Sequence, residues 1–187
     1  MFERYTDEAK RAVFFSRAEA LVRKVSVISV QDLLLGVSRD KNARASQIAS
    51  LKPRDAELRA ALGIAPFPKN IDYSQLGPKN AIPLDNDAKK TLAYAAQEAD
   101  SDHEFWLDTD HLLRGLLRFP NATSDALAKL GIELEAMRAA SVRNRQEFPP
   151  RRVHNWLRLR AFVKKFRAHL LLIAILLIIF AYLKSQG

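Results

Sequence analysis

The chain has 187 residues, which is enough for one or two small domains with a hydrophobic core. It contains no cysteine, so disulfide bonds and thiolate chemistry are excluded, and the composition fits a reducing compartment. The formal net charge is +9, yet all 21 acidic residues lie before residue 151, together with most of the 30 basic residues. Residues 1–150 are therefore nearly neutral, which disfavours nucleic-acid binding, and the excess positive charge belongs to residues 151–187.

The first 145 residues repeat themselves at a constant offset of 79 positions. The offset is the same across four successive segments, so no insertion separates the two copies. A repeat at a fixed period indicates one supersecondary unit packed on a copy of itself, as in a scaffold for binding. The identical pairs include Lys10 and Lys89, Glu19 and Glu98, Ala20 and Ala99, Leu33 and Leu112, Leu34 and Leu113, Gly36 and Gly115, Arg39 and Arg118, and Leu51 and Leu130.

Each copy begins with an expected helix. Thr6 is a favourable N-cap for the first of these helices, and Asp85 stands at the matching place in the second copy. Small residues follow at spacings of three and four, which lets another helix approach closely. These residues are Ala9, Ala12, Ser16 and Ala20 in one copy, and Ala88, Thr91, Ala95 and Ala99 in the other.

The next expected helix contains VQDLLLGV in the first copy and TDHLLRGL in the second, capped by Ser29 and by Asp108 or Thr109. Gly36 and Gly115 lie inside these helices, where glycine costs about 1 kcal/mol relative to alanine. Because the cost is repeated, we expect each glycine to allow a backbone contact with the small-residue stripe.

The remaining pattern predicts an all-α fold with about eight helices, four per copy, related by a pseudo-two-fold axis. No stretch alternates with a period of two for long enough to predict a strand. Shorter helices are expected at about residues 43–51, 54–62, 123–130 and 133–145, with a helix stop at Gly131. The expected parts are repeat one at about 1–62, a linker at 63–81, repeat two at about 82–145, and a proline-containing linker at 146–152.

The segment 170–183 is the longest apolar run and contains no charged side chain. It would form a helix about 21 Å long, shorter than the ~30 Å hydrocarbon core of a bilayer, and such runs often form buried helices. Its content of Leu, Ile and Phe, and the flanking Arg167 and Lys184, favour a transmembrane anchor instead. A helix buried in an oligomer is the alternative.

Residues 153–169 form an expected basic amphipathic helix that lies on a membrane surface and leads into the anchor. Most of the flanking basic residues precede the run, which predicts a single-pass protein with its N-terminal domain in the cytoplasm, at a bacterial inner membrane. The N-terminus lacks the apolar region of a secretory signal. The residues expected to contact lipid are Trp156, Phe166, Leu170, Leu176, Phe180 and Leu183.

The segments FERYTDEAKRAVFFSRAEA and AIPLDNDAKKTLAYAAQEA, with the pair VQDLLLGV and TDHLLRGLL, resemble the duplicated N-terminal domain of Clp-family AAA+ unfoldases, the Clp repeat domain. The resemblance covers residues 1–145 and both copies. It implies a compact double four-helix unit that binds adaptor proteins or substrates and passes them to ATPase rings. The P-loop signature G-x-x-x-x-G-K-[ST] is absent, so we expect neither ATPase activity nor a cofactor.

In some members of that family, a threonine at the first helix start and a glutamate one residue into the second helix bind phosphorylated arginine. The matching positions are Thr6 with Gln31, and Asp85 with Asp110. Gln31 lacks the charge for pairing with a guanidinium, and Asp85 would repel a phosphate unless it acts as a cap. Three interpretations remain open: a phosphoarginine site, helix caps and first-turn polar residues only, or a site for another basic or polar peptide.

Other chemistry has weaker support. His103 and His111 are eight positions apart, which is not a helical ligand spacing, so no metal site is expected despite the acids around them. His111 is better explained as a first-turn residue of its helix. No nucleophile elbow or other activating context occurs, so no catalytic residue is expected. Phe105 and Trp106 belong either to an exposed partner-binding patch or to the core.

Two functions fit these observations. The favoured one is a non-enzymatic, membrane-tethered protein-binding module that captures a Clp-type ATPase, an adaptor or a proteolysis substrate. Tethering raises the effective concentration at the surface, so a weak site can suffice. The alternative is a structural membrane protein that forms a homo-oligomer through its C-terminal helix.

Overall fold

The computed structural model describes residues 2–68, 70–71 and 82–147. The predicted basic helix at 153–169 and the predicted anchor at 170–183 lie outside the described residues, and with them Trp156, Phe166, Leu170, Leu176, Phe180 and Leu183. In the described ranges, no helix combines the length and the apolar character that a membrane crossing requires.

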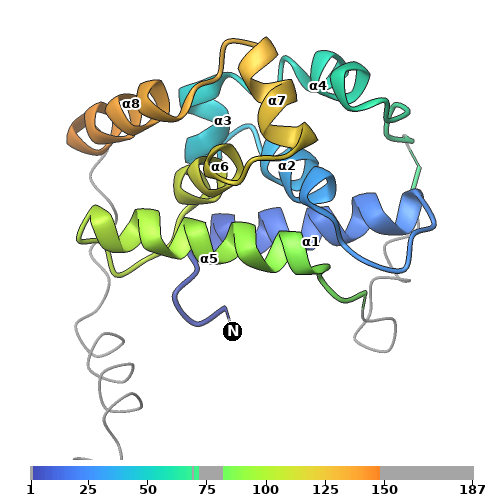
Figure 1. Ribbon diagram of the computed structural model, residues 1–187, viewed down its shortest axis with the longest axis horizontal. Helices are drawn as coiled ribbons and strands as arrows, with labels where there is room; N and C mark the ends of the chain where they lie inside the picture. The colour runs from blue at the N-terminus through green and yellow to red at the C-terminus, as the bar shows by residue number, and fades with distance from the viewer. Residues whose placement is uncertain (1, 69, 72–81, 148–187) are drawn as a thin grey trace, which may run out of the picture. The chain divides into compact units, whose positions relative to one another are not determined.

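Eight helices make up the described part of the chain, four from each copy, and no strand occurs there apart from two isolated bridges. This confirms the predicted all-α fold with four helices per repeat. In Figure 1 the long helices α1 and α5 form one side, α2 and α6 lie centrally, and α3, α4, α7 and α8 lie on the other side. The helices are α1 (Asp7–Val22), α2 (Val30–Arg39), α3 (Arg44–Ala49), α4 (Asp55–Leu62), α5 (Asn86–Ser101), α6 (Thr109–Arg118), α7 (Ala122–Lys129) and α8 (Leu134–Glu147).

The predicted helix starts are confirmed by their caps. The Thr6 hydroxyl accepts a hydrogen bond from Ala9 N at 3.1 Å, and the Asp85 carboxylate accepts one from Ala88 N at 2.6 Å. Capping boxes begin the second helix of each copy, and they pair Ser29 with Asp32 and Asp108 with His111. These side chains satisfy N–H groups that have no partner inside the helix.

The predicted contact between each helical glycine and the small-residue stripe is also present. A Cβ atom on Gly115 would lie 2.7 Å from both Thr91 O and Ala95 N, closer than a carbon atom can approach. In the first copy, a Cβ atom on Gly36 would lie 2.6 Å from Ser16 N. The backbones of α2 and α6 therefore touch those of α1 and α5 at equivalent points, and only glycine permits this approach.

A buried glutamate joins three helices within the first copy. Glu19 of α1 is 1% exposed, and its Oε1 accepts hydrogen bonds from Arg59 Nη2 at 2.7 Å and from Arg39 Nη1 at 3.1 Å. Arg59 Nη1 also donates to Glu19 Oε2 at 3.0 Å. The charge-assisted pairs compensate for the desolvation of the carboxylate and hold α2 and α4 against α1.

The second copy repeats this arrangement at an offset of 79 positions. Glu98 is likewise 1% exposed, and it accepts from Arg138 Nη2 at 2.5 Å and from Arg118 Nη1 at 3.4 Å. Burial by itself would raise the pKa of Glu98, but the hydrogen bonds and charge of Arg138, with the charges of Arg114 and Arg118, lower it below its usual value. We call each glutamate and its two equivalent arginines the glutamate clamp.

The helix crossing gives a stability test. Replacing Gly115 by alanine should destabilise the domain by about 1–3 kcal/mol, because the added carbon overpacks the crossing with α5. Helix propensity alone predicts the opposite sign, a gain of about 1 kcal/mol. Urea unfolding followed by circular dichroism measures the difference. Ala93→Gly is the control, because Ala93 lies on α5 and its side chain is exposed. This variant should lose only the difference in helix propensity, about 1 kcal/mol. A more stable Gly115→Ala variant would contradict the proposed crossing.

Candidate functional site

The two copies exchange backbone hydrogen bonds where their helices begin. Tyr5, just before the cap of α1, forms a parallel bridge with Leu107, just before the cap of α6. Thr6 N donates to Leu107 O at 3.0 Å, and Leu107 N donates to Arg4 O at 2.7 Å. The start of α1 is thereby fixed beside the start of a helix from the other copy.

The equivalent exchange occurs at the other pair of helix starts. Leu84 forms a parallel bridge with Ile28; Ile28 N donates to Pro83 O at 2.7 Å, and Asp85 N donates to Ile28 O at 3.0 Å. Every donor and acceptor here is 79 positions away from its counterpart in the first exchange. The start of α5 therefore lies beside the start of α2.

This exchange decides which of the four predicted site residues lie near each other. Thr6 lies beside the helix that carries Asp110, and Asp85 lies beside the helix that carries Gln31. The two positions of one copy are separated by a helix of 16 residues, about 24 Å long. In the first copy, the start of α2 lies near the end of α1 rather than near its start, because Arg23 at the end of α1 donates to Asp32 of α2 at 2.8 Å. The structure thus groups these residues across copies rather than within one copy.

The first junction contains a half-buried cluster of charged and polar side chains, which we call the Thr6–Asp108 junction. Its members are Thr6, Arg44, Asp108 and Asp110. Thr6 Oγ1 donates to Asp108 Oδ1 at 3.2 Å, and Arg44 Nη1 lies 3.8 Å from Asp108 Oδ2. The side chains of Arg44 and Asp108 are 12% and 16% exposed, so both retain some contact with solvent.

Asp108 carries the main electrostatic signature of this junction. Burial raises the pKa of Asp108 above its usual value, and the nearby Asp110 charge raises it further, while Arg44, a bond from Thr109 N and the bond from Thr6 lower it. Burial is the largest of these effects, so desolvation of the Asp108 carboxylate dominates the increase, and the Asp110 charge adds to it.

Asp110 itself is only 1% exposed. One carboxylate oxygen lies 3.5 Å from His111 Nδ1 and the other lies 3.9 Å from Arg114 Nη2. Arg114, which is also 1% exposed, pairs with Asp102 as well. Asp110 therefore acts on the junction through the electrostatic effect of its charge on Asp108. Direct contact between Asp110 and a partner stays a prediction.

The second junction is less charged. Asp85 caps α5 and is half-buried, and Gln31 is half-buried on the adjoining helix. Ser29 donates from Oγ to Asp32 at 2.7 Å, so Asp32 is committed to its own helix start. Partner binding by Gln31 and Asp85 also stays a prediction.

Phe105 and Trp106 are both half-buried, with ring centroids 5.0 Å apart in an edge-to-face arrangement. Arg4 lies 5.7 Å from the Phe105 ring, and its Nε donates to Phe105 O at 3.0 Å. The pair therefore belongs partly to the core and partly to the surface. Within the described ranges, no group of three His, Asp or Glu residues could hold a metal ion.

The sequence indicated Asp108 as a helix cap and as one of the acids near His103 and His111, and it gave no signal for Arg44. Arg44 begins α3, and Ala45 N of the same helix donates to Thr109 Oγ1 at 3.1 Å. This hydrogen bond joins the two copies. The spacing of residues within one copy therefore could not predict that α3 and Arg44 lie beside the start of α6.

The raised pKa of Asp108 predicts a pH dependence. The folded state binds the Asp108 proton more tightly than the unfolded chain does, so this residue favours folding below its ordinary pKa and loses that contribution as the pH rises through the folded value. The variant Asp108→Asn keeps a capping oxygen and removes the titration. Its stability relative to the parent should increase between pH 3 and pH 7, as measured by urea unfolding. A constant difference across this range would contradict the assignment.

Known proteins resemble this chain over about three quarters of its length. No family model matches it. Over 140 residues, it is 26% identical to the ClpA homologues that are ATP-binding subunits of the ATP-dependent Clp protease in Porphyra purpurea and Pyropia yezoensis. The match covers 74% of this chain and 17% of each of these relatives, so this chain corresponds to a small part of their length.

Two solved structures share the fold. The N-terminal domain of the chaperone ClpD from Arabidopsis thaliana superimposes with a TM-score of 0.57 at 20% identity, covering 78% of this chain and 97% of that domain. A structure described as part of a malarial protein secretion system gives a TM-score of 0.59 at 18% identity, covering 79% of this chain and 99% of that one. The resemblance expected from the sequence is confirmed: the duplicated eight-helix unit of this chain has the fold of the Clp N-terminal domain.

Proposed function

We propose that this chain is a protein-binding module, without ATPase activity of its own, that captures a protein partner through the Thr6–Asp108 junction at the cytoplasmic face of a membrane. The fold carries the proposal, because the match spans 97% of the ClpD N-terminal domain. Clp N-terminal domains are the parts of Clp unfoldases that bind substrates and adaptors. The expected partner is a Clp-type ATPase, an adaptor or a proteolysis substrate.

The charge of the junction favours a basic group on the partner. Arg44 Nη1 lies 3.8 Å from Asp108 Oδ2, while Asp110, whose charge also acts on Asp108, lies near Arg114 and His111. A lysine or arginine side chain can form a charge-assisted hydrogen bond with the exposed part of Asp108. A cation of the partner would join Arg44 in stabilising the ionised form of Asp108, which burial and the Asp110 charge disfavour.

The same geometry disfavours a phosphorylated arginine at this position. Thr6 Oγ1 already donates to Asp108 Oδ1, so a phosphate that accepts from Thr6 would approach a carboxylate oxygen about 3.2 Å from that hydroxyl. Two like charges at such a distance repel each other, and burial strengthens the repulsion. Of the two kinds of ligand considered from the sequence, a basic peptide therefore has better physical support than a phosphorylated arginine.

A peptide-binding experiment tests this proposal. A labelled arginine-rich peptide should bind the full-length chain in detergent, and Asp108→Asn should weaken binding about tenfold, since hydrogen bonds to charged groups contribute about 1.5–3 kcal/mol. Fluorescence anisotropy measures both affinities, and the same peptide carrying phosphoarginine should bind more weakly.

Asp125→Asn is the matched control, because Asp125 is an exposed acid in the first turn of α7. It should leave the affinity within about twofold of the parent. Asp85→Asn makes the equivalent change at the second junction and shows whether that junction binds too. Equal weakening by Asp108→Asn and Asp125→Asn would indicate only diffuse electrostatic attraction.

The membrane tether is the second part of the proposal, and it rests on the sequence of residues 153–183. An uncharged run follows a basic segment there, which suits a helix that enters a bilayer from the cytoplasmic side. Holding a recognition domain at the surface would raise its effective concentration toward partners at the same membrane.

Deleting residues 168–187 should move the protein from the membrane fraction to the soluble fraction, as measured by ultracentrifugation and immunoblotting. Retention in the membrane fraction would contradict an anchoring helix. If the deletion instead abolishes self-association in sedimentation experiments while the location stays unchanged, the alternative of a structural homo-oligomer gains support.

A further inference from the structure

A polar pocket of about 330 Å³ opens where α2 ends and α4 begins, away from both junctions. We call it the Arg39 pocket. It is lined by Arg39, Lys52, Asp55, Arg59, Pro66, Phe67 and Pro68. Its wall therefore combines three cations with an aromatic ring and two prolines, while one of its two nearby carboxylates, Glu19, lies buried beneath the arginines.

Arg39 is held firmly at the edge of this pocket. Its Nη1 donates to Glu19 Oε1 at 3.1 Å, and its guanidinium carbon lies 3.5 Å from the centre of the Phe67 ring and 5.4 Å from that of Phe15. Aromatic rings and a carboxylate restrict the guanidinium, and its stacking on Phe67 is close. Of its five N–H donors, one makes a hydrogen bond within the described ranges. The group is thus preorganised and retains donors for a ligand.

Lys52 and Arg59 play different parts. Lys52 is exposed, and its ammonium group makes no hydrogen bond or ion pair with the described residues. Arg59 is committed to Glu19, Asp55 and Ala65 O, the last at 3.3 Å, so it fixes the segment that carries Phe67. The three cations exceed the two carboxylates by one charge, and the excess belongs to the groups that are open to a ligand.

The second copy retains the glutamate clamp but not the pocket residues. The positions 79 residues after Lys52, Asp55 and Phe67 hold Gly131, Leu134 and Gln146. In addition, α8 continues to Glu147, whereas α4 ends at Leu62 and Gly63 adopts a left-handed conformation with φ 66°. The clamp therefore does not require these pocket residues, because the second copy keeps the clamp with other residues at the equivalent positions.

We propose that the Arg39 pocket is a second peptide-binding site, which takes the carboxylate of a glutamate or aspartate side chain. The donors of Arg39 and the ammonium group of Lys52 fit a carboxylate, and an arginine fork pairs with one in two hydrogen bonds. Phe67 and the two prolines offer apolar surface to the rest of the peptide. This inference rests on the proposed function only in taking the ligand to be a peptide. The Arg39 pocket prefers an acidic side chain, whereas the Thr6–Asp108 junction prefers a basic one.

The test uses the full-length chain in detergent with a labelled glutamate-rich peptide and its glutamine-substituted counterpart. The glutamate peptide should bind more tightly, and Lys52→Glu should weaken it about five- to tenfold because it replaces an attraction by a repulsion. Phe67→Ala, which removes the ring on Arg39, should weaken binding about threefold. Circular dichroism checks the fold of both variants.

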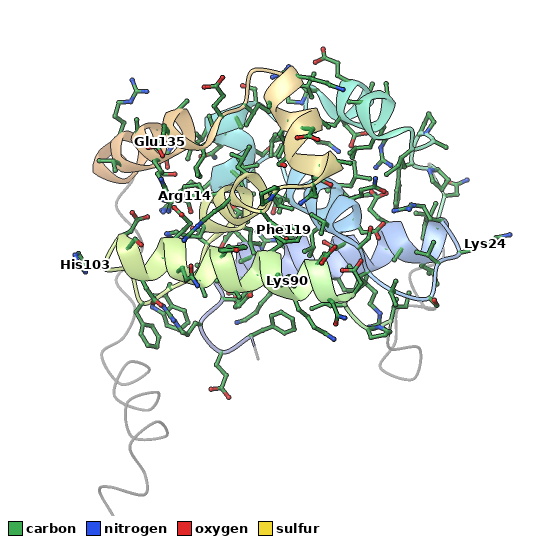
Figure 2. All side chains as sticks on the ribbon, in the orientation of Figure 1. Lys24, Lys90, His103, Arg114, Phe119 and Glu135 are labelled. Atoms are coloured by element: carbon green, nitrogen blue, oxygen red, sulfur yellow. The ribbon has the colours of Figure 1, made fainter. Side chains whose placement is uncertain are left out.

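Arg143→Glu is the control. It makes the same change of charge at an exposed position on α8, which lies at the opposite end of the domain from α4 in Figure 1. Side chains with nitrogen and oxygen atoms project from all the described helices (Figure 2), so a control for diffuse attraction is needed. Equal weakening by Lys52→Glu and Arg143→Glu would overturn the proposal, as would equal binding of the two peptides, or saturable binding of inorganic phosphate with none of the peptide.

The two proposed sites can fail independently. Lys52→Glu should leave binding of the arginine-rich peptide unchanged, and Asp108→Asn should leave binding of the glutamate-rich peptide unchanged. If the arginine-rich peptide binds and the glutamate-rich peptide does not, the Arg39 pocket is overturned while the proposed function stands. The converse result would retain the pocket and remove the Thr6–Asp108 junction as a site.

Discussion

Four backbone hydrogen bonds between the copies set the geometry on which both junctions depend. They join residues just before a helix in one copy to residues just before a helix in the other, so α1 starts beside α6 and α5 starts beside α2. The caps then meet in pairs, as with Thr6 and Asp108 at 3.2 Å. Because each junction takes one helix start from each copy, neither copy forms a complete junction alone.

Duplication has preserved the parts that hold helices together and changed the parts that face a ligand. Both copies keep a helical glycine against the neighbouring backbone, and both keep a buried glutamate between two arginines. In contrast, the junctions differ in charge, and the positions equivalent to Lys52 and Phe67 of the Arg39 pocket hold Gly131 and Gln146 in the second copy. A packing contact restricts both copies equally, whereas a binding surface needs to be present only once.

The sequence predicted the elements well because their signals are local. The caps at Thr6 and Asp85, and the glycines opposite small residues, follow from spacing within one copy. The clamp also had a signal, since Arg59 and Arg138 are separated by the same 79 positions as Glu19 and Glu98. The junction partners could not be predicted this way, because Arg44 meets Asp108 across the copies. The burial of Asp110 likewise depends on Arg114, which occupies the place of Leu35 in the first copy.

The exchange of helix starts has a further consequence for folding. A single copy would leave these backbone groups to water or pair them with a second chain, and in the paired form its stability would depend on protein concentration. Joining two copies in one chain turns that bimolecular step into an intramolecular one at a fixed effective concentration. Covalent linkage thus makes the domain independent of dilution, and it frees each half to acquire a surface that a symmetric dimer would have to present twice.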